Sequence, residues 1–96
     1  MILYSSKETC NILYEQGCVD EYFFDGVMRR EHLASTNIVD GVAMPHGLDK
    51  NVIKNRITII TLDHPLTWGD KKVDIIILLA INLIKVLICT VVLSIL

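Results

Sequence analysis

The segment of residues 41–47 places the strongest constraint on how this chain folds. It reads Gly-Val-Ala-Met-Pro-His-Gly, and its apolar centre, residues 42–44, has the composition of a short strand. Pro45 fixes its own backbone angle, and Gly47 gives the chain conformational freedom directly after the histidine. We therefore expect His46 at the end of a strand, on a tight turn that lifts its imidazole out of the core. An imidazole held in this way can act as a nucleophile or carry a proton.

Length, composition and charge define the class of protein. The 96 residues are enough for one domain, residues 1–96, near the lower size limit for a self-sufficient core. Hydrophobic residues make up 52% of the chain and charged residues 21%, which excludes a disordered polypeptide. The net charge of -2 gives no general attraction to nucleic acid or to an anionic membrane, so we expect no direct contact with either.

The cysteines and the N-terminal residues predict a cytoplasmic protein. Three cysteines without C-x-x-C spacing favour reduced thiols over a disulfide framework or a zinc site. Residues 1–4 contain no basic region followed by a long apolar run, so no signal peptide is indicated. The sequence also shows no metal-ligand cluster, phosphate-binding glycine loop or Ser-His-Asp order. We therefore expect no cofactor and no metal.

Two helices are predicted before the histidine segment. Ser5 with Glu8 forms a capping-box pattern and Gly17 is a natural stop, so a first helix is expected over about residues 6–16. Asp20 or its neighbours can cap a second helix that runs to about Leu33. The side chains expected to face inward are Cys10, Leu13 and Tyr14 from the first helix and Phe23 and Val27 from the second.

Strand patterns alternate with turn signals in the rest of the chain. Residues 57–62 are rich in β-branched side chains, and residues 73–81 are apolar on both faces, as in a strand buried inside a sheet. Turns are expected at residues 63–65 and 68–70, and residues 1–4 look like the end of another strand. This order predicts an α/β (α+β) fold in which helices flank a small mixed β-sheet.

The C-terminal stretch allows two interpretations. Residues 75–96 form a 22-residue segment that is long and apolar enough for a membrane span. However, Asn82 and Lys85 fall near its middle, where a charge is costly in lipid. The β-branched block before Asn82 favours a strand followed by an apolar helix, which makes direct membrane contact the weaker alternative.

Arg30-Glu31, then Thr36, and then residues 41–47 resemble the active-site signature of a known family. It is the fructose/mannitol-type enzyme IIA domain (EIIA type 2) of the bacterial phosphoenolpyruvate-dependent sugar phosphotransferase system. The resemblance covers about residues 5–82, and the spacing of 16 from Arg30 to His46 matches the family pattern. It implies a sandwich of the kind found in phosphotransferase/anion transport proteins. Similar domains also occur as regulatory modules of sugar-operon antiterminators and activators.

The resemblance also implies roles for individual residues and partners. His46 would accept a phosphoryl group from the carrier protein HPr and pass it to a cysteine of the EIIB domain of a sugar permease. Arg30 would stabilise the charge of the phosphoryl group, and Thr36 could hydrogen-bond either that group or the imidazole. If active, the chain is a phosphotransferase component without a cofactor. If it is instead a regulatory module, a fused or separate regulatory domain is its partner.

Several features depart from the family pattern. The family usually has a glycine where this chain carries residues 37–39, Asn-Ile-Val, and many members have a second histidine where residues 83–96 have none. The family domain is normally longer at both ends. We therefore expect a partial or degenerate copy, and a non-catalytic binding module stays an alternative. Of the remaining candidates, we expect His32 and His64 to be solvated and Trp68 to fill the core beside a turn. Four acidic residues are expected to be solvated charges of a surface helix: Asp20, Glu21, Asp25 and Glu31.

Overall fold

The computed structural model describes residues 2–37 and 39–82 of the chain, which form two helices and a three-stranded sheet. The helix expected near the C-terminus falls on residues 83–96 and lies outside the described residues. In chain order the elements are α1 (Ile2–Glu15), α2 (Phe23–Leu33), β1 (Gly41–Ala43), the short 3-10 helix η1 (Asp49–Asn51), β2 (Arg56–Trp68) and β3 (Lys71–Ala80).

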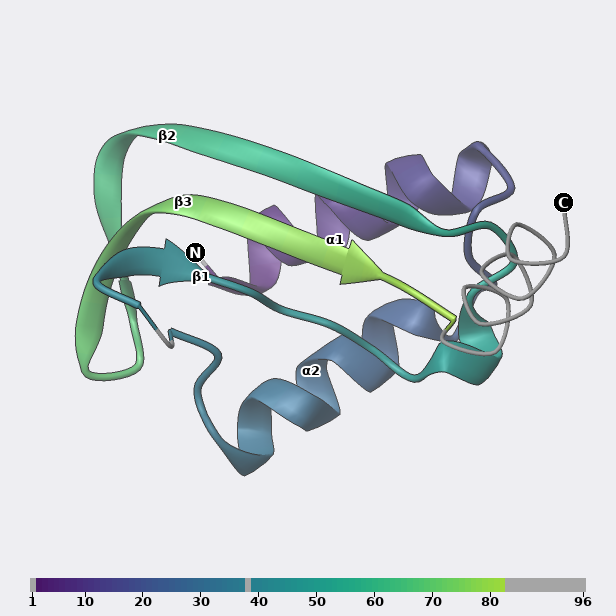
Figure 1. The fold of residues 1–96 in the computed structure, drawn as a ribbon, viewed down its shortest axis with the longest axis horizontal. Helices are drawn as coiled ribbons and strands as arrows, with labels where there is room; N and C mark the ends of the chain where they lie inside the picture. Colours follow the sequence, from purple (N-terminus) through teal and green to yellow (C-terminus); the bar gives the residue numbers. More distant parts are fainter. Residues whose placement is uncertain (1, 38, 83–96) are drawn as a thin grey trace, which may run out of the picture.

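The sheet is mixed, as the sequence predicted. Its order is β1-β3-β2, so the apolar β3 occupies the centre, with β1 parallel to it and β2 antiparallel to it. Figure 1 shows the long β2 and the short β1 on either side of β3. β3 therefore pairs with a strand on each of its two edges.

One face of the sheet carries the main core. Leu78 and Ala80 of β3 are buried against side chains from both helices, so α1 and α2 lie on the same face. Phe23 and Val27 face inward as predicted, and burial raises the pKa of the Cys10 thiol to about 12. The members of this core are Cys10, Leu13, Cys18, Val19, Phe23, Val27, Val52, Leu78 and Ala80. A second cluster at the other end of the sheet contains Ala43, Trp68, Val73 and Ile76.

The opposite face of the sheet is more open. Ile57 and Ile59 of β2 are 61% and 66% exposed. They pair across the ladder with Leu79 and Ile77 of β3, and directly paired residues point to the same side of a sheet. Since α1 and α2 pack on the face of Leu78, this second apolar face is covered by neither helix.

The N-terminal expectations need correction. Residues 2–4 are helical and do not end a strand, because α1 already begins at Ile2. Ser5 therefore lies inside the helix and does not cap it. Tyr14 is also not a core residue, since it is 53% exposed while Leu13 is buried. Neighbouring positions differ by about 100° around a helix, so Leu13 and Tyr14 cannot both face the centre of the core.

The turn expected at residues 63–65 is also wrong. These residues belong to β2, which continues to Trp68, with a break in its pairing register between Thr61 and Leu66. Pro65 fits here because β2 is an edge strand, where a residue without an N–H removes no ladder hydrogen bond from the centre. The turn at residues 69–70 is confirmed, and Gly69 adopts a positive φ of 67° there.

The membrane interpretation of residues 75–96 does not hold for its first part. Ile75 to Ala80 lie in β3 and pair on both sides with other strands, as the favoured alternative predicted. Over the residues that the structure describes, no helix has the length and apolar character to cross a bilayer.

Candidate functional site

His46 lies just beyond β1, on the chain segment that continues alongside β3. The carbonyl of the fully buried Pro45 accepts a hydrogen bond from the Leu79 N–H at 2.9 Å. His46 then forms an isolated parallel bridge with Leu79. The main chain is therefore fixed by the central strand, while the imidazole itself is half-buried. The position of His46 just after a strand agrees with the prediction from the sequence. The expected tight turn is wrong: the chain continues alongside β3 through His46, and Gly47 does not adopt a positive φ.

A backbone carbonyl sets the tautomer of the imidazole. The Nδ1 atom of His46 lies 3.1 Å from the Met44 carbonyl oxygen. A carbonyl oxygen can only accept a hydrogen bond, so Nδ1 carries the hydrogen in the neutral ring. The lone pair then resides on Nε2, the nitrogen on the far side of the ring from the backbone. The geometry thus leaves Nε2 as the nucleophilic atom.

Two glycines lie where α2 approaches the residues that follow His46. A Cβ on Gly47 would lie 3.0 Å from the Phe23 ring and 3.1 Å from the Phe23 carbonyl oxygen. A Cβ on Gly26 would lie 3.4 Å from the Leu48 nitrogen. The close approach at Gly47 depends on its missing side chain, whereas a Cβ on Gly26 would meet Leu48 at nearly ordinary contact distance. Figure 1 shows the segment between β1 and η1 running alongside α2. The first half of α2 is therefore close to the residues that follow His46.

Arg30 lies one helical turn beyond Gly26, on the same side of α2. Since the Thr36 carbonyl accepts a hydrogen bond from the Met44 N–H at 3.0 Å, the chain after α2 runs beside the start of the histidine segment, residues 44–48. Arg30 thus lies between the Gly26 contact and this loop along α2. Its Nη1 donates to the Ala34 carbonyl at 2.6 Å, which leaves further guanidinium donors for an anion.

Thr36 is buried, and its hydrogen-bonding groups both engage Glu31. Its hydroxyl donates to Glu31 Oε1, and its backbone N–H donates to Glu31 Oε2 at 3.2 Å. Within the described part of the chain, no hydrogen bond joins Thr36 or Arg30 to the imidazole. The structure thus connects Thr36 to His46 only through the backbone of Met44, and the Thr36 side chain is attached to a carboxylate.

Glu31 was expected to be a solvated helix charge, and that expectation is wrong. Besides both groups of Thr36, its carboxylate accepts the indole N–H of the buried Trp68 at 3.1 Å. Two signals in the sequence could have found this contact. An acidic residue in the last turn of a helix opposes the helix dipole, and a buried tryptophan needs an acceptor for its N–H.

The loop after α2 is also fixed to the hairpin between β2 and β3. The Asn37 amide donates to the Trp68 carbonyl and, at 3.0 Å, to Asp70 Oδ1. The hydrogen bond from Asn37 is the main reason why the pKa of Asp70 is lowered, with smaller effects from its own backbone N–H and from Lys71. Asn37, which stands in the part of the loop where the family usually has a glycine, is therefore a structural anchor.

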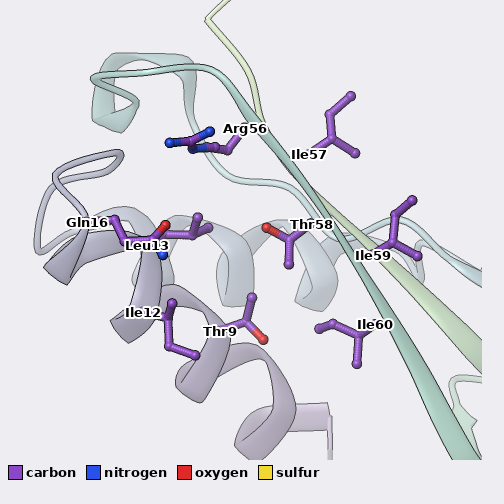
Figure 2. A pocket seen from close by; sticks show the side chains of 9 residues that line it. All are labelled: Thr9, Ile12, Leu13, Gln16, Arg56, Ile57, Thr58, Ile59 and Ile60. Carbon is purple, nitrogen blue, oxygen red and sulfur yellow. The ribbon is translucent and has the colours of Figure 1, made fainter.

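Two hollows flank these elements. A pocket of about 460 Å³ is lined by His46, Gly47, Leu48, Asp49, Leu79 and Ile81, so the imidazole can be reached from outside. Figure 2 shows a second hollow between α1 and β2, into which Thr58 and Ile60 point, while Ile57 and Ile59 point away from the helix. This second hollow contains no histidine, cysteine or carboxylate, and nothing there resembles a reactive site.

The sequence matches one protein family over most of its length. Residues 7–85 correspond to the family described as "Phosphoenolpyruvate-dependent sugar phosphotransferase system, EIIA 2". The chain belongs to this family. The resemblance carried by Arg30, Thr36 and residues 41–47 is thereby confirmed.

Three relatives illustrate where such domains occur. The chain is 36% identical to the transcriptional regulator ManR of Bacillus subtilis, over 79% of this chain and 12% of ManR. It is 40% identical to the 2-O-alpha-mannosyl-D-glycerate-specific EIIABC component of Escherichia coli, over 64% of this chain and 10% of that protein. It is 29% identical to the mannitol-specific enzyme IIA component of Halalkalibacterium halodurans, over 74% of this chain and 51% of the relative. The chain thus spans about half of the length of the mannitol-specific relative and about a tenth of the other two.

Solved structures confirm the fold. IIA mannitol from Escherichia coli superposes with a TM-score of 0.75 at 19% identity, over 91% of this EIIA chain and 68% of that one. A IIA domain from Streptococcus pyogenes superposes with a TM-score of 0.74 at 24% identity, over 85% of this chain and 56% of that one. The two helices and the mixed sheet are therefore those of an EIIA sandwich.

Proposed function

We propose that this EIIA domain is a cytoplasmic phosphocarrier and that His46 is its phosphoryl acceptor. The observation that carries the proposal is the contact of His46 Nδ1 with the Met44 carbonyl, which leaves the Nε2 lone pair available. A neutral imidazole nitrogen is the form that can attack phosphorus. Catalysis in such a relay consists mainly of positioning and charge stabilisation.

The proposed reaction has two transfers. In the first, Nε2 of His46 attacks the phosphorus of phospho-HPr, a new N–P bond forms, and the N–P bond to the HPr histidine breaks with its electron pair leaving on that nitrogen. Arg30 stabilises the phosphoryl oxygens through its guanidinium donors. In the second, a cysteine thiolate of an EIIB domain attacks the phosphorus, and His46 leaves as neutral imidazole with Nδ1 still protonated.

The partners follow from this relay. Among solved structures with the same fold is a complex of enzyme IIA mannitol and phosphorylated enzyme IIB mannitol from Escherichia coli, with a TM-score of 0.67 at 20% identity. This supports an EIIB domain as the acceptor. We propose HPr as the donor, docking in turn on the surface around the half-buried imidazole.

A second candidate function is regulatory. The similarity to ManR, at 36% identity, extends over 79% of this chain. In such a module, phosphorylation of His46 would add negative charge beside Arg30 and change contacts with a neighbouring regulatory domain. In either function Thr36 would hold the loop after α2 in place, because its hydroxyl donates to Glu31. A direct contact between Thr36 and the phosphoryl group stays a prediction.

Phosphoryl transfer from phosphoenolpyruvate through enzyme I and HPr tests the proposal. We compare the chain with His46→Ala and with His64→Ala, a matched control at an exposed histidine of β2. The wild type and His64→Ala should take up an acid-labile label, and His46→Ala should take up none. A chase with EIIB then separates a carrier, which loses the label, from a regulator, which keeps it. Equal labelling of His46→Ala, or an unlabelled folded wild type, would refute the assignment.

A further inference from the structure

We propose that Glu31 is a positioning residue, which holds Arg30 and His46 in the arrangement that phosphoryl transfer requires. The role in transfer rests on the proposed function. Glu31 itself touches neither the imidazole nor any reacting atom in the described structure. It acts through the loop that connects α2 to β1.

The carboxylate of Glu31 joins three parts of the fold. It lies in the last turn of α2 and accepts two hydrogen bonds from Thr36 in the following loop and one from Trp68 at the end of β2. Thr36 is 3% exposed and Trp68 is fully buried. Hydrogen bonds to an ionised acceptor are the strong ones, and buried donors without a partner are costly. Glu31 therefore fixes this loop against both helix and sheet.

The same short loop holds both functional side chains. The Ala34 carbonyl accepts from Arg30 Nη1 at 2.6 Å. The Thr36 carbonyl accepts from the Met44 N–H at 3.0 Å, and the Met44 carbonyl is the group that contacts His46 Nδ1 at 3.1 Å. Hydrogen bonds thus connect Glu31 through Thr36 and Met44 to His46, and Ala34 in the same loop is bonded to Arg30.

Loss of the Glu31 carboxylate should therefore lower the rate of phosphoryl transfer more than the affinity for phospho-HPr. In Glu31→Ala the donors of Thr36 and Trp68 lose their acceptor, and the loop can shift. Because a displacement of roughly 1 Å can reduce a transfer rate about 100-fold, we expect a decrease on the order of 10- to 100-fold in the rate at saturating phospho-HPr. The concentration of phospho-HPr at half-saturation should change less than about threefold, since the docking surface around His46 stays in place.

Glu31→Gln is the matched control because its amide can satisfy the same three groups. The amide oxygen can accept from the Thr36 N–H and the Trp68 indole. The amide nitrogen can donate to the Thr36 hydroxyl, which then turns and accepts. If Glu31 acts through hydrogen-bond geometry, this variant should keep at least roughly a third of the wild-type rate, unlike Glu31→Ala.

The experiment is single-turnover phosphorylation of the full chain by purified phospho-HPr, with the rate at saturation, the half-saturating concentration and the labelled fraction measured separately. A variant that only folds poorly lowers the labelled fraction and leaves the rate of the folded molecules unchanged. A reduced saturated rate in Glu31→Ala together with a near wild-type rate in Glu31→Gln supports the proposal. A fast Glu31→Ala, or two equally slow variants, overturns it. If Glu31→Ala does not fold, Thr36→Val removes only the hydroxyl bond and should still lower the saturated rate, and a wild-type rate there overturns the proposal.

A second readout separates this inference from the proposed function. If the wild type takes up no label, the proposed function fails, but Glu31 can still be tested by ¹⁵N NMR of the His46 ring. The ring should show one tautomer with the hydrogen on Nδ1 in the wild type and in Glu31→Gln, and mixed tautomers in Glu31→Ala. An unchanged His46 spectrum in Glu31→Ala would overturn the role of Glu31 in placing the imidazole.

Discussion

At the scale of single residues, the backbone around His46 determines which atom can react. The Met44 carbonyl lies two residues before the imidazole and accepts the hydrogen of Nδ1. Because it has no side chain, Gly47, the residue directly after the histidine, can lie against Phe23. The imidazole is therefore oriented by local chain geometry, and in the proposed relay the positive charge comes from Arg30 on a different element.

Arg30 offers a test at the same scale. Arg30→Lys keeps the positive charge but loses the planar pair of donors that can hold two phosphoryl oxygens at once. We expect its rate of phosphorylation at saturating phospho-HPr to fall roughly 10-fold or more, and that of Arg30→Gln to fall further. Single-turnover labelling measures both. A full rate in Arg30→Gln would show that Arg30 is only a charge at the end of α2.

The candidate site residues differ in how well the sequence reveals them. His46 and Arg30 could be proposed because their signals are local: a Pro-His-Gly segment after a strand, and a fixed spacing from the arginine. For Glu31 the sequence offers only indirect signals, an acidic residue in the last helical turn and a tryptophan that needs an acceptor, and neither identifies Trp68, 37 positions away, as its partner. A contact of that separation arises only when the β2–β3 hairpin packs against the loop after α2.

At the scale of elements, the pattern of apolar residues predicted which strands exist better than it predicted where each strand ends. β3 was recognised because both of its faces are apolar, and it is indeed the central strand. β2 was predicted to end at Leu62, yet it runs to Trp68. The turn signal of residues 63–65 did not end the strand because an edge strand tolerates proline and a register shift. Tertiary position therefore overrode the local signal.

The two faces of the sheet predict different sensitivities to substitution. Ile76 of β3 is 2% exposed, and Ile59 of β2 is 66% exposed. We expect Ile76→Ala to lower the free energy of unfolding by about 2–5 kcal/mol, because it leaves a cavity. Ile59→Ala, the matched control with the same loss of atoms, should cost about 0.5 kcal/mol or less. Denaturant titration of both variants measures the difference, and similar losses would mean that the outer face is packed.

At the scale of the whole molecule, the described residues form the part of an EIIA sandwich that contains the candidate site. The chain spans 51% of a mannitol-specific relative and 68% of IIA mannitol from Escherichia coli, and it covers the segments that carry Arg30, Thr36 and His46. α1 and α2 cover one face of the sheet, and the face of Ile57 and Ile59 is apolar and open to further contacts.

The most direct test of the account is to identify the phosphorylated atom. Long-range ¹H–¹⁵N NMR spectra of the imidazoles, recorded before and after phosphorylation by phospho-HPr, distinguish the two ring nitrogens of His46. We predict that the unmodified neutral ring carries its hydrogen on Nδ1 and that phosphorylation shifts the Nε2 resonance. A phosphoryl group on Nδ1, or a spectrum in which the His46 signals do not change while another histidine is modified, would contradict the account.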